Sequence, residues 1–253
     1  MLDDASEMCR PFVHETLHYK TLHFSLHEAQ SRMLKREPCT LVVDYTRTMM
    51  GFLLFNGQPQ RVAMIGLGGG SLAKFCYREL PRTRIDVVEI NPHVLALRDE
   101  FHVPPDDERF RVHLDDGAHF VRRAHRQFNV LLVDGYTREG VPAKLASQAF
   151  YDQCRQALCD NGIMVLNLYC DDLNAHLERI RRSFGRGVFT VCEADGTNNV
   201  VFAHAGDDPF PRLSSSIGDP GHLRRAAGAL LKPAFSRVAA AMHAQCDSAA
   251  RCD

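Results

Sequence analysis

Apolar residues in the middle of the chain form short runs that alternate with amphipathic stretches. The apolar runs are RVAMIGL, RIDVVEI, RFRVHLDD, FNVLLVDGY and IMVLNLY. Such runs are typical of strands buried on both faces of a parallel sheet. The stretches between them, SLAKFCYREL, NPHVLALRDEF, GAHFVRRAH, AKLASQAFYDQCRQAL and LNAHLERIRRSF, have helical spacing. The pattern predicts an α/β fold with a Rossmann-like, doubly wound, mostly parallel sheet.

Several boundaries can be placed within this pattern. Pro81 ends the first helical stretch, Asn91 is a candidate cap for the second, and Asn161-Gly162 ends the long fourth one. GVFTVCEA and NNVVFAHA are predicted to be a closing pair of strands. The α/β domain is therefore expected to span residues 61–205.

The two ends of the chain have different patterns. Residues 1–60 are predicted to be β-rich, because HETLHYKTLHFSL alternates polar with apolar residues and TLVVDYT is a second β-branched run. MMGFLLF is expected to be a short buried helix or turn. Residues 206–253 are predicted to be a loop followed by a helical tail that Pro233 interrupts. The division into these three parts is the domain prediction.

Composition narrows the possible functions. Hydrophobic residues make up 45% and charged residues 24% of the 253, and the formal net charge of -1 gives no field for nucleic acid or an anionic membrane. No apolar run reaches the roughly 18 residues that span a bilayer. The acidic start MLDDASEMCRPF is no signal peptide, so a cytoplasmic location is expected.

Cysteine and histidine are abundant, yet no metal site is predicted. The nine cysteines contain no CxxC pair, and their number is odd, so they are interpreted as reduced thiols that pack as small core residues. A zinc site or a disulfide framework is the less favoured alternative. His14, His18, His23 and His27 lie close together in sequence, but no cysteine or carboxylate completes a recognisable ligand pattern.

A glycine cluster follows the first buried strand. Gly66, Gly68, Gly69 and Gly70 occupy four of five positions between that strand and the next helix. Glycines here let the backbone turn tightly and approach a ligand, and the helix N-terminus points its N–H groups at that ligand. The cluster predicts a cofactor-binding loop, although a simple tight turn would explain two of the glycines.

Acidic residues end the next strands. Glu89, followed by Ile90, ends the second strand 23 residues after Gly66, a spacing at which a carboxylate accepts hydrogen bonds from ribose hydroxyls. The alternative is a solvent-exposed strand end. Asp134 ends the fourth strand, so it is expected to face the same crevice, near the reactive end of the cofactor.

The third strand ends at Asp115-Asp116-Gly117. A carboxylate there can accept a hydrogen bond from an exocyclic adenine amine, and Asp116 can also cap the following helix. A dinucleotide is the alternative ligand, but the spacing is G-x-G-G-G-S rather than G-x-G-x-x-G. The residues therefore favour an adenosyl sulfonium cofactor.

The runs VAMIGLGGGSLAKF, VVEINPHVLAL, VHLDDGAHFV, FNVLLVDGYT, VPAKLASQAFYDQCRQAL and NGIMVLNLY resemble the spermidine synthase (polyamine aminopropyltransferase) family over about residues 40–205. The resemblance implies a class I methyltransferase-like α/β sheet, a shortened N-terminal β-hairpin region and decarboxylated S-adenosylmethionine as the cofactor. It also implies a small amine as the acceptor and, as that family often shows, a homodimer.

The resemblance also assigns roles by position. Glu89 would hold the ribose, Asp116 and Gly117 the adenine, and Asp134 would accept a proton from the attacking amine. Pro142-Ala143 and Leu145 match the stretch near the adenine and the sulfonium. Tyr45 lies one position from a tyrosine that lines the family's substrate site.

Two departures from the family bear on the group transferred. Gly69 stands where the family usually has an Asp that binds the aminopropyl amine, and Thr137 replaces the second Asp of the catalytic loop. The loop GLGGGSL also resembles that of spermidine-synthase-like methyltransferases, which use intact S-adenosylmethionine.

Three functional hypotheses follow. The first is aminopropyl transfer with Asp134 as general base, and with Tyr136, Thr137 and Glu139 near the amine. The second is methyl transfer on the same scaffold, and the third is a catalytically silent, cofactor-binding partner. Basic clusters such as Arg122-Arg123 are interpreted as solvated helix faces rather than a nucleic-acid site.

Overall fold

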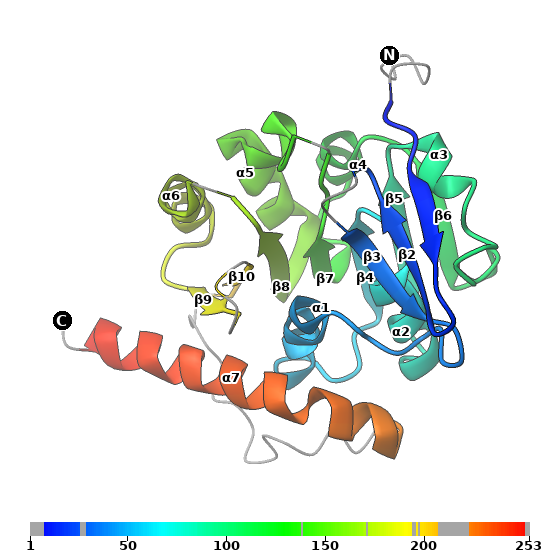
Figure 1. Ribbon diagram of the computed structural model, residues 1–253. Helices are drawn as coiled ribbons and strands as arrows, with labels where there is room; N and C mark the ends of the chain where they lie inside the picture. The colour runs from blue at the N-terminus through cyan, green and yellow to red at the C-terminus, as the bar shows by residue number, and fades with distance from the viewer. Residues whose placement is uncertain are drawn as a thin grey trace.

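The computed structural model describes residues 8–25, 29–137, 139–170, 172–193, 196, 198–206 and 223–250, with the backbone alone for 246–250. A seven-stranded sheet in the order β6-β5-β4-β7-β8-β10-β9 forms its centre (Figure 1). The strands are β4 (Arg61–Ile65), β5 (Arg84–Glu89), β6 (Phe110–Leu114), β7 (Phe128–Val133), β8 (Leu158–Leu168), β9 (Val188–Cys192) and β10 (Asn199–His204). The first five are parallel, and β10 pairs antiparallel with β8 and β9. The predicted α/β fold is confirmed.

Helices cover both faces of this sheet, because alternate residues of each strand point to opposite sides. Val165 of β8 belongs to one buried core and its neighbour Leu166 to the other. The helical segments on the Val165 side are α1 (Asp44–Met49), η1 (Met50–Leu54), α2 (Ser71–Glu79), α3 (Pro92–Leu95) and α7 (Arg225–Ala250). Those on the Leu166 side are α4 (Gly117–Arg123), η2 (Ala143–Ala146), α5 (Gln148–Ala157) and α6 (Leu173–Phe184).

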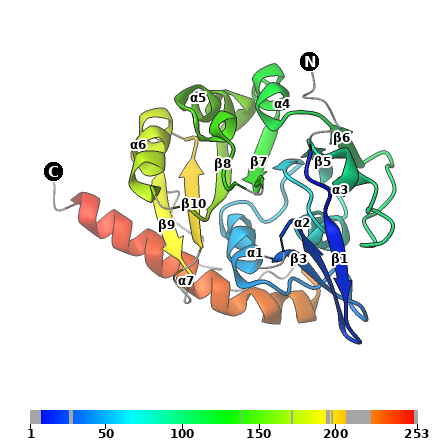
Figure 2. The ribbon, with the colours of Figure 1, turned by 45° about the horizontal axis from the view of Figure 1, so that its top comes forward.

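The N-terminal strands form a separate antiparallel sheet of β1 (Phe12–Glu15), β2 (Tyr19–His23) and β3 (Ala29–Leu34). Leu22 and Met33 point inward and are buried in the same core as α2, so this sheet packs on the main domain. In Figure 2 the blue strands of this sheet lie beside α2, and α7 runs past α1 and β9. The three-part division of the chain stays a prediction.

The run TLVVDYT is not a strand, so that prediction is wrong. In the structure the helix α1 begins at Asp44, and Arg47 holds its first turn by bonding Asp44 at 2.9 Å and the Leu41 carbonyl at 2.9 Å. Thr46, Thr48 and Met49 are buried on one side. Packing against the sheet and α7 overrides the β propensity of this run, and it places Tyr45 on a helix.

Two predicted helices are shorter than expected. Residues 91–101 contain only α3, capped by the Asn91 side chain, because the chain must turn back at His102 to enter β6. Residues 143–158 divide at Ser147, whose hydroxyl accepts the Phe150 N–H at 3.1 Å and caps α5. Asn161-Gly162 does not end that helix; it lies inside β8, where Asn161 has a φ of 58°.

The C-terminal helix continues through Pro233 rather than breaking there. The proline ring removes one hydrogen bond, but Pro233 is exposed, so water can solvate the carbonyl left without a partner. No helix in the described ranges is long and apolar enough to cross a membrane. The cysteines whose side chains are described are free thiols, and no three potential ligands in that part of the chain gather as a metal site. His27 lies outside the described residues.

Lys74 of α2 is a fully buried lysine whose ammonium donates to the Phe101 carbonyl at 2.7 Å. Burial lowers the pKa of Lys74 to about 8, from 10.5. Between these values the unfolded chain binds more protons than the folded one, so stability rises with pH. At 1.36 kcal/mol per unit, the rise amounts to about 3 kcal/mol.

We therefore expect Lys74→Met to remove this rise. Urea unfolding of the wild type and the variant at several pH values from about 8 to about 10.5 gives the free energy of unfolding of each protein. The difference between the two free energies should change across this pH range. Lys232→Met, at an exposed position of α7, is the control and should leave the pH slope unchanged. If the free energies of unfolding of the wild type and Lys74→Met change with pH in parallel, the lowered pKa of Lys74 is contradicted.

Candidate active site

The ends of four adjacent parallel strands are tied to one another by backbone hydrogen bonds. Asp115 donates to the Glu89 carbonyl at 3.1 Å, Gly66 to the Val88 carbonyl at 2.8 Å, and Asp134 to the Ile65 carbonyl at 2.9 Å. The loops that carry the predicted glycines and carboxylates therefore leave one edge of the sheet side by side. In a doubly wound sheet this carboxyl edge is where ligands bind.

The glycine loop is packed too tightly for side chains. A Cβ on Gly66, whose φ is +94°, would stand 2.2 Å from the Asp134 carbonyl oxygen. On Gly70, with a φ of +68°, it would stand 2.4 Å from a Val103 methyl. At Gly68 the nearest neighbour of such an atom is the Ser31 Cβ at 3.7 Å, so the loop is more open there.

Glu89 is buried at the end of β5, and both carboxylate oxygens accept backbone hydrogen bonds. Leu67 donates to one at 3.0 Å and Asn91 to the other at 2.8 Å, while the N–H groups of Gly68 and Ile90 also face the carboxylate. Burial raises the pKa of Glu89, and these N–H groups oppose the rise. These four N–H groups match the about four acceptor positions of a carboxylate, so a ribose hydroxyl would share an oxygen with one of them.

Asp116 caps α4 as the sequence allows, with one oxygen accepting N–H groups of Ala118 at 2.8 Å and His119 at 3.3 Å. The other oxygen accepts a hydrogen bond from Lys144 at 3.0 Å. Burial opposes ionisation, but Lys144 and the helix N–H groups hold the pKa of Asp116 below its usual value.

The residues on either side of Asp116 have different roles. Asp115 is paired with Arg123, so its carboxylate is engaged on the surface of α4. A Cβ on Gly117 would stand 2.4 Å from an Ile65 methyl, so glycine is required for α4 to approach β4. The adenine acceptor stays a prediction, for which Asp116 rather than Asp115 is the candidate.

Asp134 lies between two hydrogen-bond donors from distant parts of the chain. The Tyr45 hydroxyl donates to Oδ2 at 3.1 Å and the Asn167 amide to Oδ1 at 3.0 Å. Burial raises the pKa of Asp134, while the two donors oppose the rise. The pKa of Tyr45 is raised as well, by burial and by the adjacent carboxylate. A carboxylate with a raised pKa is a stronger base than an exposed one.

Sequence reasoning included Tyr45 and missed Asn167. The available signal was a single polar residue near the end of the apolar run IMVLNLY, which carries it to the same edge of the sheet as the strand-end acids.

The other predicted side chains of this loop make no hydrogen bond to Asp134 in the part of the chain that the structure describes. The Tyr136 hydroxyl donates to the Asn167 carbonyl at 2.8 Å and accepts the Tyr169 N–H at 2.7 Å, so it fastens the loop after β7 to the end of β8. Burial raises the pKa of Tyr136. Thr137 and Glu139 are exposed on a turn closed at Gly140, and the Thr137 hydroxyl donates to the Gly140 carbonyl.

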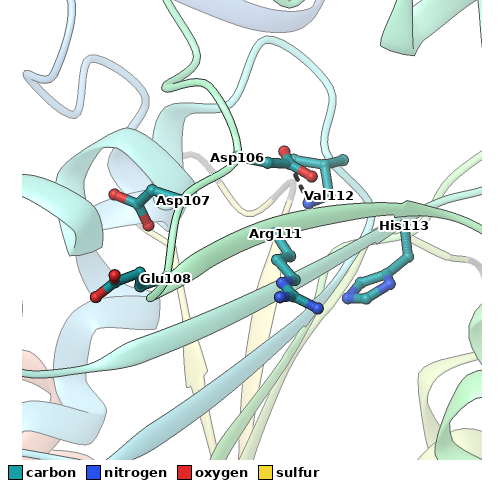
Figure 3. Close-up of a pocket in the computed structure, with 6 residues that line it drawn as sticks. All are labelled: Asp106, Asp107, Glu108, Arg111, Val112 and His113. Atoms are coloured by element: carbon teal, nitrogen blue, oxygen red, sulfur yellow. Dashed lines mark hydrogen bonds between the residues drawn. The ribbon is translucent and has the colours of Figure 1, made fainter.

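A shallow pocket of about 610 Å³ lies elsewhere, on the outer edge strand β6 and the loop before it (Figure 3). Asp106 and Asp107 there are already engaged, since they accept hydrogen bonds from the Val112 and Phe110 N–H groups. None of the residues predicted from the sequence lines this pocket.

The strand order, the glycine turn and the strand-end carboxylates define a class I methyltransferase-like α/β fold. A probable spermidine synthase from Corynebacterium glutamicum superposes with a TM-score of 0.67 at 17% identity, covering 77% of this chain and 76% of the other. Human methyltransferase-like protein 13, in complex with SAH, superposes with a TM-score of 0.61 at 21% identity, covering 78% and 92%.

The sequence comparisons are more specific than the fold. Residues 42–195 match the model of the spermine/spermidine synthase domain. The polyamine aminopropyltransferase of Neisseria meningitidis is 37% identical over 187 residues, which are 72% of this chain and 71% of the relative. The chain therefore belongs to the spermine/spermidine synthase family, as predicted, and is a transferase.

Proposed function

We propose that this protein transfers an aminopropyl group from decarboxylated S-adenosylmethionine to a small amine, with Asp134 as the general base. The observation that carries the proposal is the half-buried Asp134 carboxylate, held by Tyr45 and Asn167 at the carboxyl edge of the sheet. Membership of the family supports the reaction class.

The residues at the strand ends fit an adenosyl group. Glu89 ends β5 at the position expected for the ribose, Asp116 can accept from the adenine amine, and the glycine loop presents backbone without side chains. The bound sulfonium supplies an electrophilic carbon, so the protein needs only to orient an amine and remove its proton.

The proposed step balances as a substitution at carbon. The amine nitrogen forms a bond to the carbon attached to sulfur, and the electrons of the breaking C–S bond remain on sulfur as a neutral thioether. The proton lost by the nitrogen passes to Asp134. Because free amines have pKa values near 10 and are mostly protonated at neutral pH, an adjacent carboxylate is required.

Methyl transfer from intact S-adenosylmethionine is the second candidate, and Gly69 is the observation that favours it. A Cβ on Gly69 would stand 2.7 Å from the Ser31 hydroxyl and 2.9 Å from the Phe101 ring. At Gly69 this chain therefore has neither a carboxylate nor room for one, although other members of the family usually bind the aminopropyl ammonium with an Asp there. Without that carboxylate, an aminopropyl group has one charge partner fewer.

Titration calorimetry with the two cofactors distinguishes the candidates. We expect the decarboxylated form to bind at least about tenfold more tightly, a difference of about 1.4 kcal/mol. Mass spectrometry of products formed with an amine library then identifies the acceptor. A tenfold preference for intact S-adenosylmethionine would overturn aminopropyl transfer, and product formation with either cofactor would exclude a silent partner. The homodimer and the cytoplasmic location stay predictions.

A further inference from the structure

We infer that Asn167 holds Asp134 through its amide NH2 and accepts a hydrogen bond from the attacking nitrogen through its amide oxygen. The inference rests on the proposed function in that an amine is the nucleophile, but it does not depend on which alkyl group is transferred. It makes Asn167 a binding residue for the acceptor as well as a positioning residue for the base.

The position of Asn167 follows from the parallel pairing of β7 and β8. Val133 of β7 is paired with Leu166 of β8, so the residues that follow each of them, Asp134 and Asn167, leave the sheet next to each other. The alternation along each strand directs both toward the face that carries α1 and Tyr45. Only 4% of the Asn167 surface is exposed.

The orientation of the Asn167 amide is fixed by its neighbour. An ionised carboxylate only accepts hydrogen bonds, so Asn167 must direct its NH2 group to Asp134, at 3.0 Å. Its amide oxygen then points away from Asp134. That oxygen is buried and has no donor among the described residues.

A buried carbonyl without a donor destabilises the folded state by about 1–3 kcal/mol. A leucine of similar volume would complete the apolar strand without this penalty. Asn129 of β7, a half-buried asparagine, shows the usual arrangement, because its amide oxygen accepts N–H groups of Gln60 and Arg61, both at 2.9 Å. The unpaired oxygen of Asn167 therefore points to a donor that arrives with a ligand.

An alkylammonium group matches this pair of acceptors. It carries three N–H bonds, of which one gives its proton to Asp134 before the attack and so leaves the nitrogen with a lone pair and two N–H bonds. A second N–H can be donated to the Asn167 oxygen, and these two contacts fix the direction of the lone pair toward the electrophilic carbon. A hydroxyl nucleophile has a single hydrogen and cannot satisfy both acceptors.

Few titratable groups among the described residues face Asp134, so a shift of its pKa in a variant can be assigned to the residue that was changed. Tyr45 of α1 and Tyr136 of its own loop are the titratable neighbours, and Asn167 is the neutral donor from β8. Loss of the Asn167 donor should raise the pKa of Asp134, so the acid limb of the pH profile of kcat/KM moves to higher pH.

Asn167→Leu and Asn129→Leu form the test pair. We expect Asn167→Leu to lower the melting temperature less than Asn129→Leu does, because removal of the unpaired amide oxygen offsets the lost hydrogen bond to Asp134, whereas in Asn129→Leu two backbone N–H groups lose their acceptor. With the protein saturated in methylthioadenosine, the thioether product of aminopropyl transfer, calorimetry with putrescine should show binding about 10- to 100-fold weaker in Asn167→Leu. Asn167→Asp, which sets a second carboxylate beside Asp134, should shift the acid limb upward further.

The outcomes separate this inference from the proposed function. If the wild type forms product and Asn167→Leu binds putrescine equally well with an unshifted acid limb, the inference is wrong and the function stands. If the wild type forms no product but putrescine binding weakens in the variant, the function is wrong and the amine contact stands. Failure of the wild type to bind any amine of the library overturns both.

Discussion

Asp134→Asn is expected to reduce kcat by about 10²- to 10⁴-fold, the usual contribution of a general base. The variant keeps the shape of the side chain but cannot take a proton from the amine. Its new NH2 group would also face one of two donors, the Tyr45 hydroxyl and the Asn167 amide, so part of the hydrogen bonding around it is lost. Steady-state kinetics with the best amine acceptor measures the loss.

Cofactor affinity separates a catalytic defect from a structural one. We expect Asp134→Asn to bind the adenosyl cofactor within about threefold of the wild type, or roughly 0.6 kcal/mol, because Glu89 and Asp116 are unchanged. Asp160→Asn, an exposed carboxylate paired with Arg126 at the start of β8, is the matched control and should keep full kcat. Undiminished turnover in Asp134→Asn would remove Asp134 from the mechanism.

Gly66→Ala is expected to destabilise the protein by about 2–5 kcal/mol. Part of this is the cost of a side chain at a φ of +94°, and the larger part is the clash of a methyl group 2.2 Å from the Asp134 carbonyl oxygen. The backbone cannot separate easily, because Asp134 donates to the Ile65 carbonyl immediately beside Gly66. Thermal unfolding monitored by circular dichroism measures the change.

Gly140→Ala isolates the steric part of this effect. Gly140 has a φ of +107°, close to that of Gly66, but nothing lies within 4 Å of an added Cβ. Its substitution should therefore cost only the conformational term, about 1–2 kcal/mol. Equal destabilisation by the two substitutions would show that Gly66 and the Asp134 carbonyl oxygen lie further apart than in the structure.

The strands and the strand-end carboxylates could be predicted because burial leaves a local signature. A parallel strand covered on both faces is apolar at every position, so β4, β5 and β7 stand out in the sequence, and the acids that follow them mark their carboxyl ends. TLVVDYT has a similar composition but is partly helical, since its surroundings are set by α7, nearly two hundred residues further along the chain.

The sequence by itself therefore determined the fold class, the family and the edge of the sheet at which an adenosyl group is proposed to bind, since each depends on residues close together along the chain. Only the tertiary structure decided which side chains surround Asp134. Tyr45 lies 89 residues before it and Asn167 lies 33 residues after it, and Tyr136, two residues away, turns its hydroxyl to β8 instead. Such contacts depend on how β7, β8 and α1 pack, and no local pattern encodes the meeting of three separate elements.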